Sequence, residues 1–316
     1  MKFAEIAEFF ERMEVTSKRL ELTEILVELL KNTPINVISK VTYLIQGKLR
    51  PNFEGVELGI AERLAMKAIS KSAGVSMKKI EDSYKVGGDL GVTAANILKQ
   101  KTQTTFSAES ITLERVYDTL FKIAKLEGKG SQDMKIKYIS SLLNDATTNE
   151  SKFILKILLG TLRLGIAENT LMDALAIAFT DEKSNRVLIE NAYNVSSDLG
   201  YVSEVVAKQG INGIKKFEIA IFNPIRPMLA DRVKSEEDAI KKFQDEFAAE
   251  YKLDGERAQI HKKGDEIIIF SRSLEKITQY YPDIVEKIPN LLICDECILE
   301  AEVVAINEDT LSLIHI

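Results

Sequence analysis

The sequence predicts a multidomain protein, with an all-α domain followed by an α+β domain whose sheet is mixed and largely antiparallel. Its length of 316 residues suggests two domains. Apolar residues recur at helical spacing up to about residue 210, and no proline occurs between Pro51 and Pro224, as expected for packed helices. Beyond that point the hydrophobic period becomes two, which indicates strands. We expect the two domains to be residues 1–216 and 217–316.

Helical spacing is clearest in two stretches of the first domain. The apolar residues from Leu22 to Leu30 follow the i, i+3, i+4, i+7 pattern of one helix face, and Asn32 to Pro34 ends that helix. A second apolar stripe runs from Leu113 to Ala124 and ends before Gly128. Both stretches therefore predict helices with one buried face.

A short repeat links two parts of the helical region. The stretch 47–50 (GKLR) is followed by 59–62 (GIAE), and the stretch 160–163 (GTLR) is followed by 165–168 (GIAE). Each pair comes after one apolar helix and before another. The repeat predicts a duplicated helical unit with pseudo-twofold symmetry, and the alternative is a chance similarity of short helix ends.

The second domain is predicted from alternation and turn residues. Residues 209–216 (QGINGIKK) read as a linker, and Pro224 and Pro227 bracket an extended turn. Gly264 and Asp265 form a hairpin turn between two alternating segments. The elements expected here are a helix at 235–243 and strands at 217–222, 247–252, 257–262, 266–270 and 298–306.

The composition is that of an ordinary globular protein, with 45% hydrophobic and 28% charged residues. No stretch approaches the length of apolar sequence that a membrane span needs, and the N-terminus carries acids that a secretory signal lacks. Two cysteines give no disulfide framework, so we expect a cytoplasmic protein. The net charge of −6 means that any nucleic acid must be bound by local basic loops.

The stretch EYKLDGER at 250–257 carries the strongest chemical signal. Lys252 is expected to end a strand, Asp254 and Gly255 to make a tight turn, and Arg257 to begin the return strand. The acid two residues before the lysine shares its face of the strand. Burial beside a cation favours the neutral amine of a lysine, which is a nucleophile. Taken alone, these residues also fit a charged surface hairpin.

Two further charged groups follow in order. Arg272, between Ser271 and Ser273, comes directly after a predicted strand. Alternation within the strand at 298–306 places Glu300 and Glu302 on one face. Taken alone, the arginine fits a solvated surface residue, and the paired acids fit an edge strand that resists aggregation.

Together these residues resemble a known family. The K-x-D-G-x-R pattern at 252–257 is similar to the nucleotide-attachment motif of the covalent nucleotidyltransferases, which are ATP-dependent DNA ligases, RNA ligases and mRNA capping enzymes. Residues 224–230 (PIRPMLA) resemble the segment that opens the adenylation domain of archaeal and eukaryotic replicative DNA ligases. Residues 53–55 and 162–168 resemble the helical DNA-binding domain of those ligases, which RNA ligases and capping enzymes lack.

The resemblance implies an ATP-dependent DNA ligase of replication, repair and recombination, with ATP and Mg²⁺ as cofactors. Alanine 301 stands where the family usually has glycine, and we expect this small residue to serve. The resemblance implies that Lys252 is the nucleophile that forms lysine–AMP and that Glu250 recognises the adenine. It implies that Arg257 lies near the ribose and Arg272 near the phosphates. Glu302 would bind the ribose hydroxyls and the metal.

The implied partner is nicked duplex DNA, bound by a monomer, with a sliding clamp as a further partner. Helix N-termini and glycine loops suit phosphate groups because their backbone N–H groups point outward. Each such loop also fits a plain connection between helices. The candidates for DNA contact are Lys48, Arg50, Lys129, Gly130, Ser131 and Arg163.

Two remaining features concern the C-terminal region. Cys294 and Cys297 form a single C-x-x-C, which is two ligands short of a zinc site and reads as a loop. In the family, the adenylation domain continues well past Glu302 and an OB-fold domain follows. Residues 311–316 do not resemble the family, so we expect the resemblance to end near Asp309, with the adenylation domain truncated. The alternative function is then a catalytically inactive module that binds nicked DNA.

Overall fold

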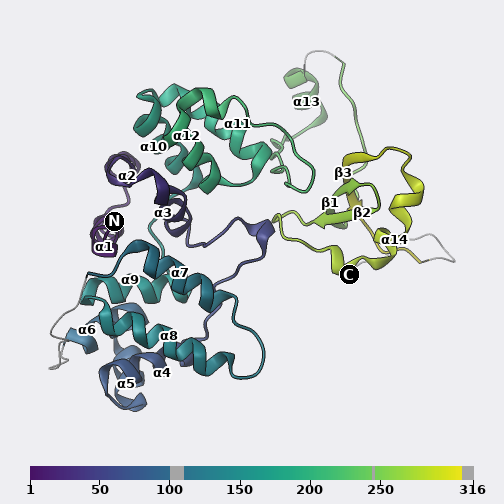
Figure 1. Ribbon diagram of the computed structural model, residues 1–316. Helices are drawn as coiled ribbons and strands as arrows, with labels where there is room; N and C mark the ends of the chain where they lie inside the picture. Colours follow the sequence, from purple (N-terminus) through teal and green to yellow (C-terminus); the bar gives the residue numbers. More distant parts are fainter. Residues whose placement is uncertain (100–109, 244–245, 308–316) are drawn as a thin grey trace. The chain divides into compact units, whose positions relative to one another are not determined.

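The computed structural model describes residues 1–99, 110–243 and 246–307 (Figure 1). The described chain divides into two units. The helical unit contains residues 1–193 and 198–217, and the sheet unit contains residues 194–197 and the described residues from Glu218 onward. No helix among the described residues is long and apolar enough to cross a membrane.

Twelve α-helices and three short 3-10 turns make up the described part of the chain as far as Ile214. The helix predicted around 22–30 is confirmed as α2, and the apolar stripe from Leu113 to Ala124 is confirmed as α7. The helices are α1 (Phe3–Glu14), α2 (Arg19–Asn32), α3 (Ile38–Ile45), α4 (Glu62–Ala73), α5 (Met77–Gly87), α6 (Leu90–Lys99), α7 (Leu113–Ala124), α8 (Ser131–Asp145), α9 (Thr148–Leu158), α10 (Glu168–Thr180), α11 (Arg186–Ser196) and α12 (Leu199–Ile214), with η1 (Ile35–Val37), η2 (Asn52–Glu54) and η3 (Lys183–Asn185) between them.

Local hydrogen bonds start several of these helices. The Thr112 hydroxyl accepts the N–H of Arg115 at the start of α7, at 3.2 Å. Thr147 and Glu150 form a reciprocal capping box at the start of α9. Such caps satisfy N–H groups that have no partner within the helix, and each stabilises its helix by about 1 kcal/mol.

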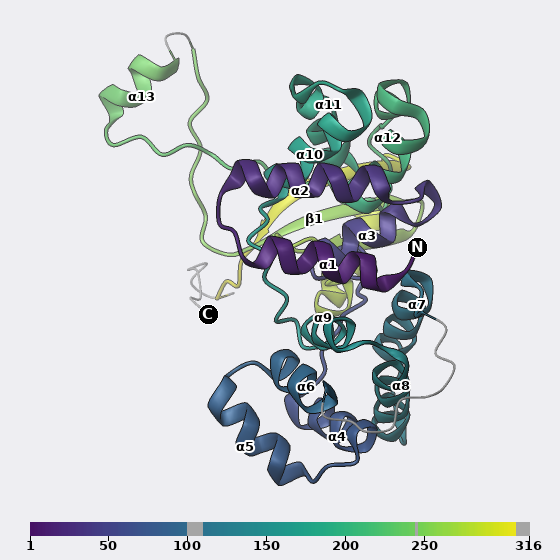
Figure 2. The ribbon, with the colours of Figure 1, turned by 90° about the vertical axis from the view of Figure 1, so that its left-hand side faces the viewer.

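The helices form two groups within the helical unit. In one group α4 packs on α8 and α6 packs on α9, while in the other α2 packs on α10 and α3 packs on α12 (Figure 1). Helix α1 packs against both α2 and α9 (Figure 2). The chain crosses from one group to the other in the α3–α4 and α9–α10 connections.

These two connections contain the repeated sequence. Gly47 and Gly160 follow α3 and α9 with φ of 68° and 64°, a left-handed conformation that favours glycine. In both, the glycine N–H bonds the carbonyl three residues earlier, and the next N–H bonds the carbonyl five residues earlier, at 2.9 to 3.1 Å. An extended alanine, Ala61 or Ala167, then precedes α4 or α10. The repeated sequence therefore forms the same backbone turn at both connections, and the duplication of a whole helical unit stays a prediction.

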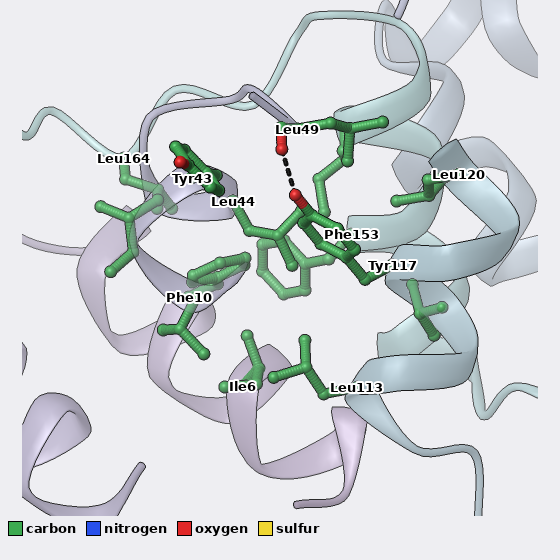
Figure 3. Packing of buried hydrophobic residues seen from close by; sticks show 14 of the residues in the cluster. Ile6, Phe10, Tyr43, Leu44, Leu49, Leu113, Tyr117, Leu120, Phe153 and Leu164 are labelled. Atoms are coloured by element: carbon green, nitrogen blue, oxygen red, sulfur yellow. Dashed lines mark hydrogen bonds between the residues drawn. The ribbon is translucent and has the colours of Figure 1, made fainter. Parts of the chain in front are cut away.

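A continuous hydrophobic core runs through the helical unit. The Phe10 and Phe153 rings meet edge to face with centroids 5.5 Å apart, and both residues are fully buried. The Tyr117 hydroxyl donates a hydrogen bond to the Leu49 carbonyl beside them (Figure 3). Burial in this site raises the pKa of Tyr117 to about 12, so the hydroxyl keeps its proton and remains a donor. The crossing connections are therefore tied into the core.

The sheet unit contains a three-stranded antiparallel sheet in the order β2-β1-β3. The predicted hairpin is confirmed, with Gly264 at φ 57° between β1 and β2. The predicted helix at 235–243 is confirmed as α13, and the predicted last strand begins and ends slightly earlier as β3. The elements are α13 (Glu236–Phe243), β1 (Glu256–Lys263), β2 (Glu266–Phe270), η4 (Thr278–Tyr280), α14 (Pro282–Leu291) and β3 (Glu296–Val303).

One face of this sheet is apolar. It packs against α14, from which Ile284, Val285 and Ile288 contact the buried cluster. Alternation along the strands places these apolar side chains on one face and polar ones on the other. The buried cluster consists of Ala258, Ile260, Ile267, Ile269 and Ile277.

Two predicted strands are wrong. Residues 217–222 and 247–252 belong to no strand. The first segment is held by side chains of β1, because His261 and Gln259 accept backbone N–H groups from Phe222 and Ile225. The second is exposed along its length. Alternation predicted a strand in both segments, but a strand also needs a partner backbone to pair with, and neither segment has one among the described residues. The predicted fold class, a helical domain before an α+β domain, is confirmed.

Candidate nucleotide site and DNA-binding loops

The polar face of the sheet brings together two of the predicted site residues, Arg257 and Glu302, with Glu300 beside them. Arg257 on β1 lies opposite Glu302 on β3, and Gln259 lies opposite Glu300. Directly opposed residues in an antiparallel pair project from the same face. The face therefore carries Arg257, Glu300 and Glu302 side by side, as the sequence predicted for the two acids.

Arg257 and Glu300 form an ion pair on this face. The guanidinium bonds Glu300 Oε2, and the Gln259 amide donates to Glu300 Oε1 at 2.7 Å. The Arg257 and Glu300 side chains are 32% and 44% exposed, so solvent weakens the pair and it contributes at most about 1 kcal/mol. The ion pair matters mainly because it fixes the direction of the Arg257 guanidinium.

A hydrogen bond joins the lysine motif to the β3 acids. The Gly255 N–H donates to Glu302 Oε1 at 3.1 Å. A Cβ at position 255 would lie 2.3 Å from the Val303 carbonyl oxygen, which no side chain tolerates. Glycine is required there because the β3 backbone passes so close. The D-G of the motif thus allows the turn to lie directly on β3.

Lys252 itself lies in an exposed segment. Its Nζ donates to the carbonyl of the neighbouring Leu253 at 3.4 Å, and Glu250 is exposed as well. The expectation that Lys252 ends a strand and lies in a confined site is wrong for this structure, because residues 247–252 form no strand that could confine it.

Arg272 lies at the same end of the sheet as the lysine motif. It is exposed in the turn that follows β2, where the Ser271 and Ser273 hydroxyls are 2.9 Å apart. The register pairs Phe270 with Gln259, so β2 ends at the edge where β1 begins. The topology therefore places Gly255, just before β1, Arg272, just after β2, and Glu302, in β3, at the same end of the sheet.

A cavity of about 730 Å³ lies on the polar face. One wall is the segment that was wrongly predicted as a strand, together with the turn after it. The other wall is the sheet, and it includes the Arg257–Glu300 pair. The lining residues are Ile219, Ile221, Ile225, Arg226, Met228, Arg257, Gln259, Glu296, Ile298 and Glu300. A pocket that is mostly apolar with a few charged groups is typical of small-molecule sites.

Comparison with known proteins identifies the family. Residues 2–176 match the family model described as DNA ligase N terminus, and residues 227–315 match the model described as ATP dependent DNA ligase domain. The chain belongs to the ATP-dependent DNA ligase family. RNA ligases and capping enzymes, the alternative that shares the lysine motif, are thereby set aside. The second match continues past Asp309, where we expected the resemblance to end; residues 308–316 lie outside the described residues.

Archaeal relatives agree. The chain is 67% identical over 310 residues to a DNA ligase of Nitrosopumilus maritimus and 62% identical over 310 residues to one of Cenarchaeum symbiosum. It is 44% identical over 319 residues to a DNA ligase of Saccharolobus solfataricus. Each alignment covers 98% of this chain and 53% of the relative, so the chain spans about half the length of the ligases it matches.

One carboxylate of this ligase-family chain, that of Glu302, could bind Mg²⁺ together with substrate phosphates. No group of three or more His, Cys, Asp or Glu side chains that could hold a metal ion occurs among the described residues. Magnesium is commonly bound by one or two carboxylates together with substrate phosphates and water. Glu302, at the sheet edge beside the lysine motif, offers a carboxylate of that kind.

The cysteines lie away from this edge. Cys294 is exposed before β3, and its carbonyl accepts a hydrogen bond from Lys262 Nζ at 2.7 Å, while Cys297 lies in β3. Burial, followed by the neighbouring Cys294, raises the pKa of the Cys297 thiol. A raised pKa disfavours the thiolate that metals bind.

The candidate DNA residues of the ligase N-terminal region lie in three connections. Arg50, in the α3–α4 connection with Lys48, pairs with Glu54 at 3.7 Å and lies over the Phe121 ring at 5.5 Å. Arg163 is exposed in the α9–α10 connection. The repeat thus places one arginine in each crossing connection.

The third connection is the turn before α8. Gly130 caps that helix with φ of 85°, Ser131 is its first residue, and Lys129 is exposed beside it. The Ser131 N–H bonds the Gly128 carbonyl at 3.2 Å, so the loop is closed on itself. The arrangement is a helix N-terminus with a lysine beside it, a combination that attracts phosphate.

Sequence reasoning missed Gln259, which lines the cavity, and His261, which bonds to Gln259 on the same strand. Both are buried, at 4% and 0% exposure, on the same face as Arg257. The signal was present in the alternation R-x-Q-x-H of β1, since polar residues at every second position of a strand mark a polar face. The apolar residues between them, Ala258 and Ile260, predict the same strand without any role for its polar face.

Proposed function

We propose that this chain takes part in ATP-dependent sealing of nicks in duplex DNA through a lysine–AMP intermediate on Lys252. In this proposal residues 1–216 are the DNA-binding domain and residues 217–316 belong to the adenylation domain. The reaction would serve DNA replication, repair and recombination. The single observation that supports the proposal best is the bond from Gly255 N–H to Glu302, which joins two motifs far apart in the sequence.

The first chemical step is the attack of Lys252 on ATP. The amine loses its proton, its nitrogen bonds the α-phosphorus, and the bond from that phosphorus to the bridging oxygen breaks. Pyrophosphate leaves with the electron pair. An exposed lysine side chain suits this role if ATP binding supplies the confinement, since catalytic geometry is often completed only in the bound complex.

In the next two steps AMP passes to DNA and then leaves. A 5′-phosphate oxygen at the nick attacks the adenylyl phosphorus and releases the lysine. The 3′-hydroxyl then attacks the DNA 5′-phosphorus and AMP departs. All three steps are in-line displacements at phosphorus, for which positioning and positive charge supply most of the catalysis.

The sheet edge supplies residues for this chemistry. Arg257 is held by Glu300 and would lie near the ribose, and Arg272 lies at the same end of the sheet, where it would meet phosphate oxygens. Glu302 would hold the ribose hydroxyls and Mg²⁺, which supplies charge neutralisation for the phosphates. Glu250 would accept a hydrogen bond from the adenine amino group once ATP orders its segment.

The two crossing connections and the turn before α8 are the proposed DNA contacts. Lys48, Arg50, Arg163 and Lys129 would bind phosphates together with Gly130 and Ser131 at the start of α8. This grip does not depend on base sequence, as sealing a nick at any position requires. Because these contacts are between basic side chains and phosphates, binding should weaken steeply as salt concentration rises.

The test is a sealing assay on a duplex with one labelled nick. The chain is mixed with the duplex, ATP and Mg²⁺, and the labelled strand is sized on a denaturing gel. We expect a joined strand with the wild-type chain and none with Lys252→Arg. A chain that neither joins the strand nor binds the nicked duplex would overturn the proposal.

One observation favours a second function. Residues 246–255, including Lys252, are exposed and lie in no helix or strand. A chain in that state would serve as a nicked-DNA-binding module without catalysis. Binding of the nicked duplex in a gel-shift assay, without a joined strand and without adduct on Lys252, would favour this function.

A further inference from the structure

Gln259 and His261 lie in the central strand β1 on the polar face of the sheet, and Gln259 lines the cavity. A buried amide and a buried imidazole are costly unless their polar atoms are bonded. Both residues are almost fully buried. Their partners therefore show what holds this part of the site together.

The Gln259 amide uses its full bonding capacity. Its Oε1 accepts from the Ile225 N–H at 2.7 Å and from His261 Nε2 at 2.9 Å. Its Nε2 donates to the Ile225 carbonyl at 3.1 Å and to Glu300 Oε1 at 2.7 Å. A primary amide has two donor hydrogens and two acceptor lone pairs, so all four are engaged. With Ile225 the side chain forms the same paired bonds that a neighbouring strand would form.

His261 continues this network. Its Nδ1 accepts the Phe222 N–H at 2.9 Å, and since a backbone N–H can only donate, the ring proton must lie on Nε2 and point to Gln259. The ring also meets the edge of Phe270, with centroids 5.0 Å apart. Burial lowers the pKa of His261 to about 4, which keeps the ring neutral and Nδ1 an acceptor.

The consequence concerns the cavity. Phe222 and Ile225 belong to the segment that forms one wall, and β1 belongs to the other. The bonds from Gln259 and His261 therefore set the separation of the walls. The same Gln259 amide holds one oxygen of Glu300 while Arg257 takes the other, so the direction of Arg257 depends on it as well.

We propose that Gln259 and His261 are positioning residues of the nucleotide site, which hold the segment around 222–225 at a fixed separation from the sheet and orient Arg257 through Glu300. This inference rests on the proposed function, because it takes the cavity beside Arg257 to be part of the ATP site. Neither residue touches the reacting atoms.

Two variants remove some of these bonds while keeping the side-chain shape. Gln259→Glu has the same size, but it loses both N–H donors and faces Glu300 with a like charge. His261→Phe keeps a ring against Phe270 and loses the acceptor for Phe222. The control is Ile260→Val, which lies between the two on the opposite, apolar face and is also buried.

Two measurements are made on each variant and on the wild-type chain. The first is hydrogen exchange at the Phe222 and Ile225 amides, with the Ile260 and Ile269 amides as a check that the sheet remains folded. The second is the KM for ATP and the kcat of lysine–AMP formation. We expect His261→Phe to raise exchange at the Phe222 amide by about tenfold, because it removes the acceptor of that amide. We expect both variants to raise the KM for ATP by about five- to tenfold, which is the loss expected from one net hydrogen bond, with a smaller change in kcat. Ile260→Val should leave both readouts near wild type.

Several outcomes would overturn the inference. Unchanged exchange at Phe222 and Ile225 would show that the pair does not hold the segment. Faster exchange with an unchanged KM would show that the nucleotide does not depend on it. If the wild-type chain forms no adduct, the proposed catalysis fails, and the inference about Gln259 and His261 is then tested by ATP binding. A weaker affinity for ATP in both variants would support the inference. An affinity equal to that of the wild type, or no ATP binding by the wild type, would overturn it.

Discussion

The helical unit and the sheet unit differ in what holds their segments together. In the helical unit one apolar core extends from Phe3 to Ile214, and even the crossing connections are anchored in it. In the sheet unit the buried cluster covers one face of three strands, and side-chain hydrogen bonds hold the segment on the other face. The residues of the proposed chemistry lie in this second, thinly packed region. Packing therefore defines the helical unit, and polar contacts define the site.

The largest expected effect concerns the helical core. Phe153→Ala removes a fully buried ring that packs on Phe10, and it should destabilise the helical unit by about 3 to 5 kcal/mol through lost burial and a cavity. Urea unfolding followed by helical circular dichroism measures this loss. Val86→Ala, at a side chain that is 91% exposed, is the control and should leave the unfolding midpoint unchanged. A loss below about 1 kcal/mol for Phe153→Ala would contradict the described core.

The next largest effect concerns the turn at Gly255. An alanine there would place its Cβ 2.3 Å from the Val303 carbonyl oxygen, so the turn must move away from β3 and lose the bond to Glu302. We expect lysine–AMP formation to fall by about 100-fold, or roughly 3 kcal/mol of barrier, while helical content stays the same. Gly264→Ala, in the hairpin at the other end of the sheet, is the comparison. Equal activity of Gly255→Ala and wild type would contradict the role of this close approach.

How far the sequence predicted the molecule depends on the kind of contact. The helices at 22–30 and 113–124 and the hairpin at 264–265 were predictable because pattern and turn chemistry act locally. The segment at 217–222 was not, because its partners are the side chains of Gln259 and His261, which are far away in sequence. The fold class and the position of Glu300 and Glu302 on one face of β3 were predictable, because they follow from the alternation within the strands.

The position of Lys252 shows the other limit. Its motif predicted chemistry from residue types, whereas its confinement depends on which backbone lies beside 247–252. No periodicity in a sequence gives the partner of an extended segment. The roles of Lys252, Glu250 and Arg272 accordingly stay predictions for experiment.

A smaller effect concerns pH. Burial lowers the pKa of His261 from its usual 6.5 to about 4, so between these values the unfolded chain binds a proton that the folded chain does not. The free energy of unfolding is therefore at its full value above pH 6.5, where the imidazole is neutral in both states. It falls as pH decreases toward 4, by on the order of 1 to 3 kcal/mol. The groups facing the ring, Gln259, Phe270 and the Phe222 backbone, carry no charge that would reverse this sign.

The measurement is urea unfolding of the sheet unit at several pH values, for the wild type and for His261→Phe. The difference in slope between the two chains isolates this residue from the carboxylates that also titrate. We expect the wild type to lose more stability than His261→Phe as pH falls. Parallel pH profiles would mean that the imidazole is accessible to protons in the folded chain.

The smallest effect tests how thinly the region around α13 is packed. Ile240 is 60% exposed on that helix, and α13 has no buried residue. Ile240→Ala should therefore change the free energy of unfolding by no more than about 0.5 kcal/mol, as is usual for surface positions. Thermal unfolding measures it. A loss above about 1 kcal/mol would show that α13 is packed against another part of the protein.

The most direct test of the account is to locate AMP on the chain. The protein is incubated with ATP and Mg²⁺, digested, and its peptides are sequenced by mass spectrometry. We predict one AMP on Lys252, lost in Lys252→Arg, and reduced in Gly255→Ala. Adduct on another lysine, or none on a chain that binds ATP, would contradict the assignment of Lys252 as the nucleophile at this sheet edge.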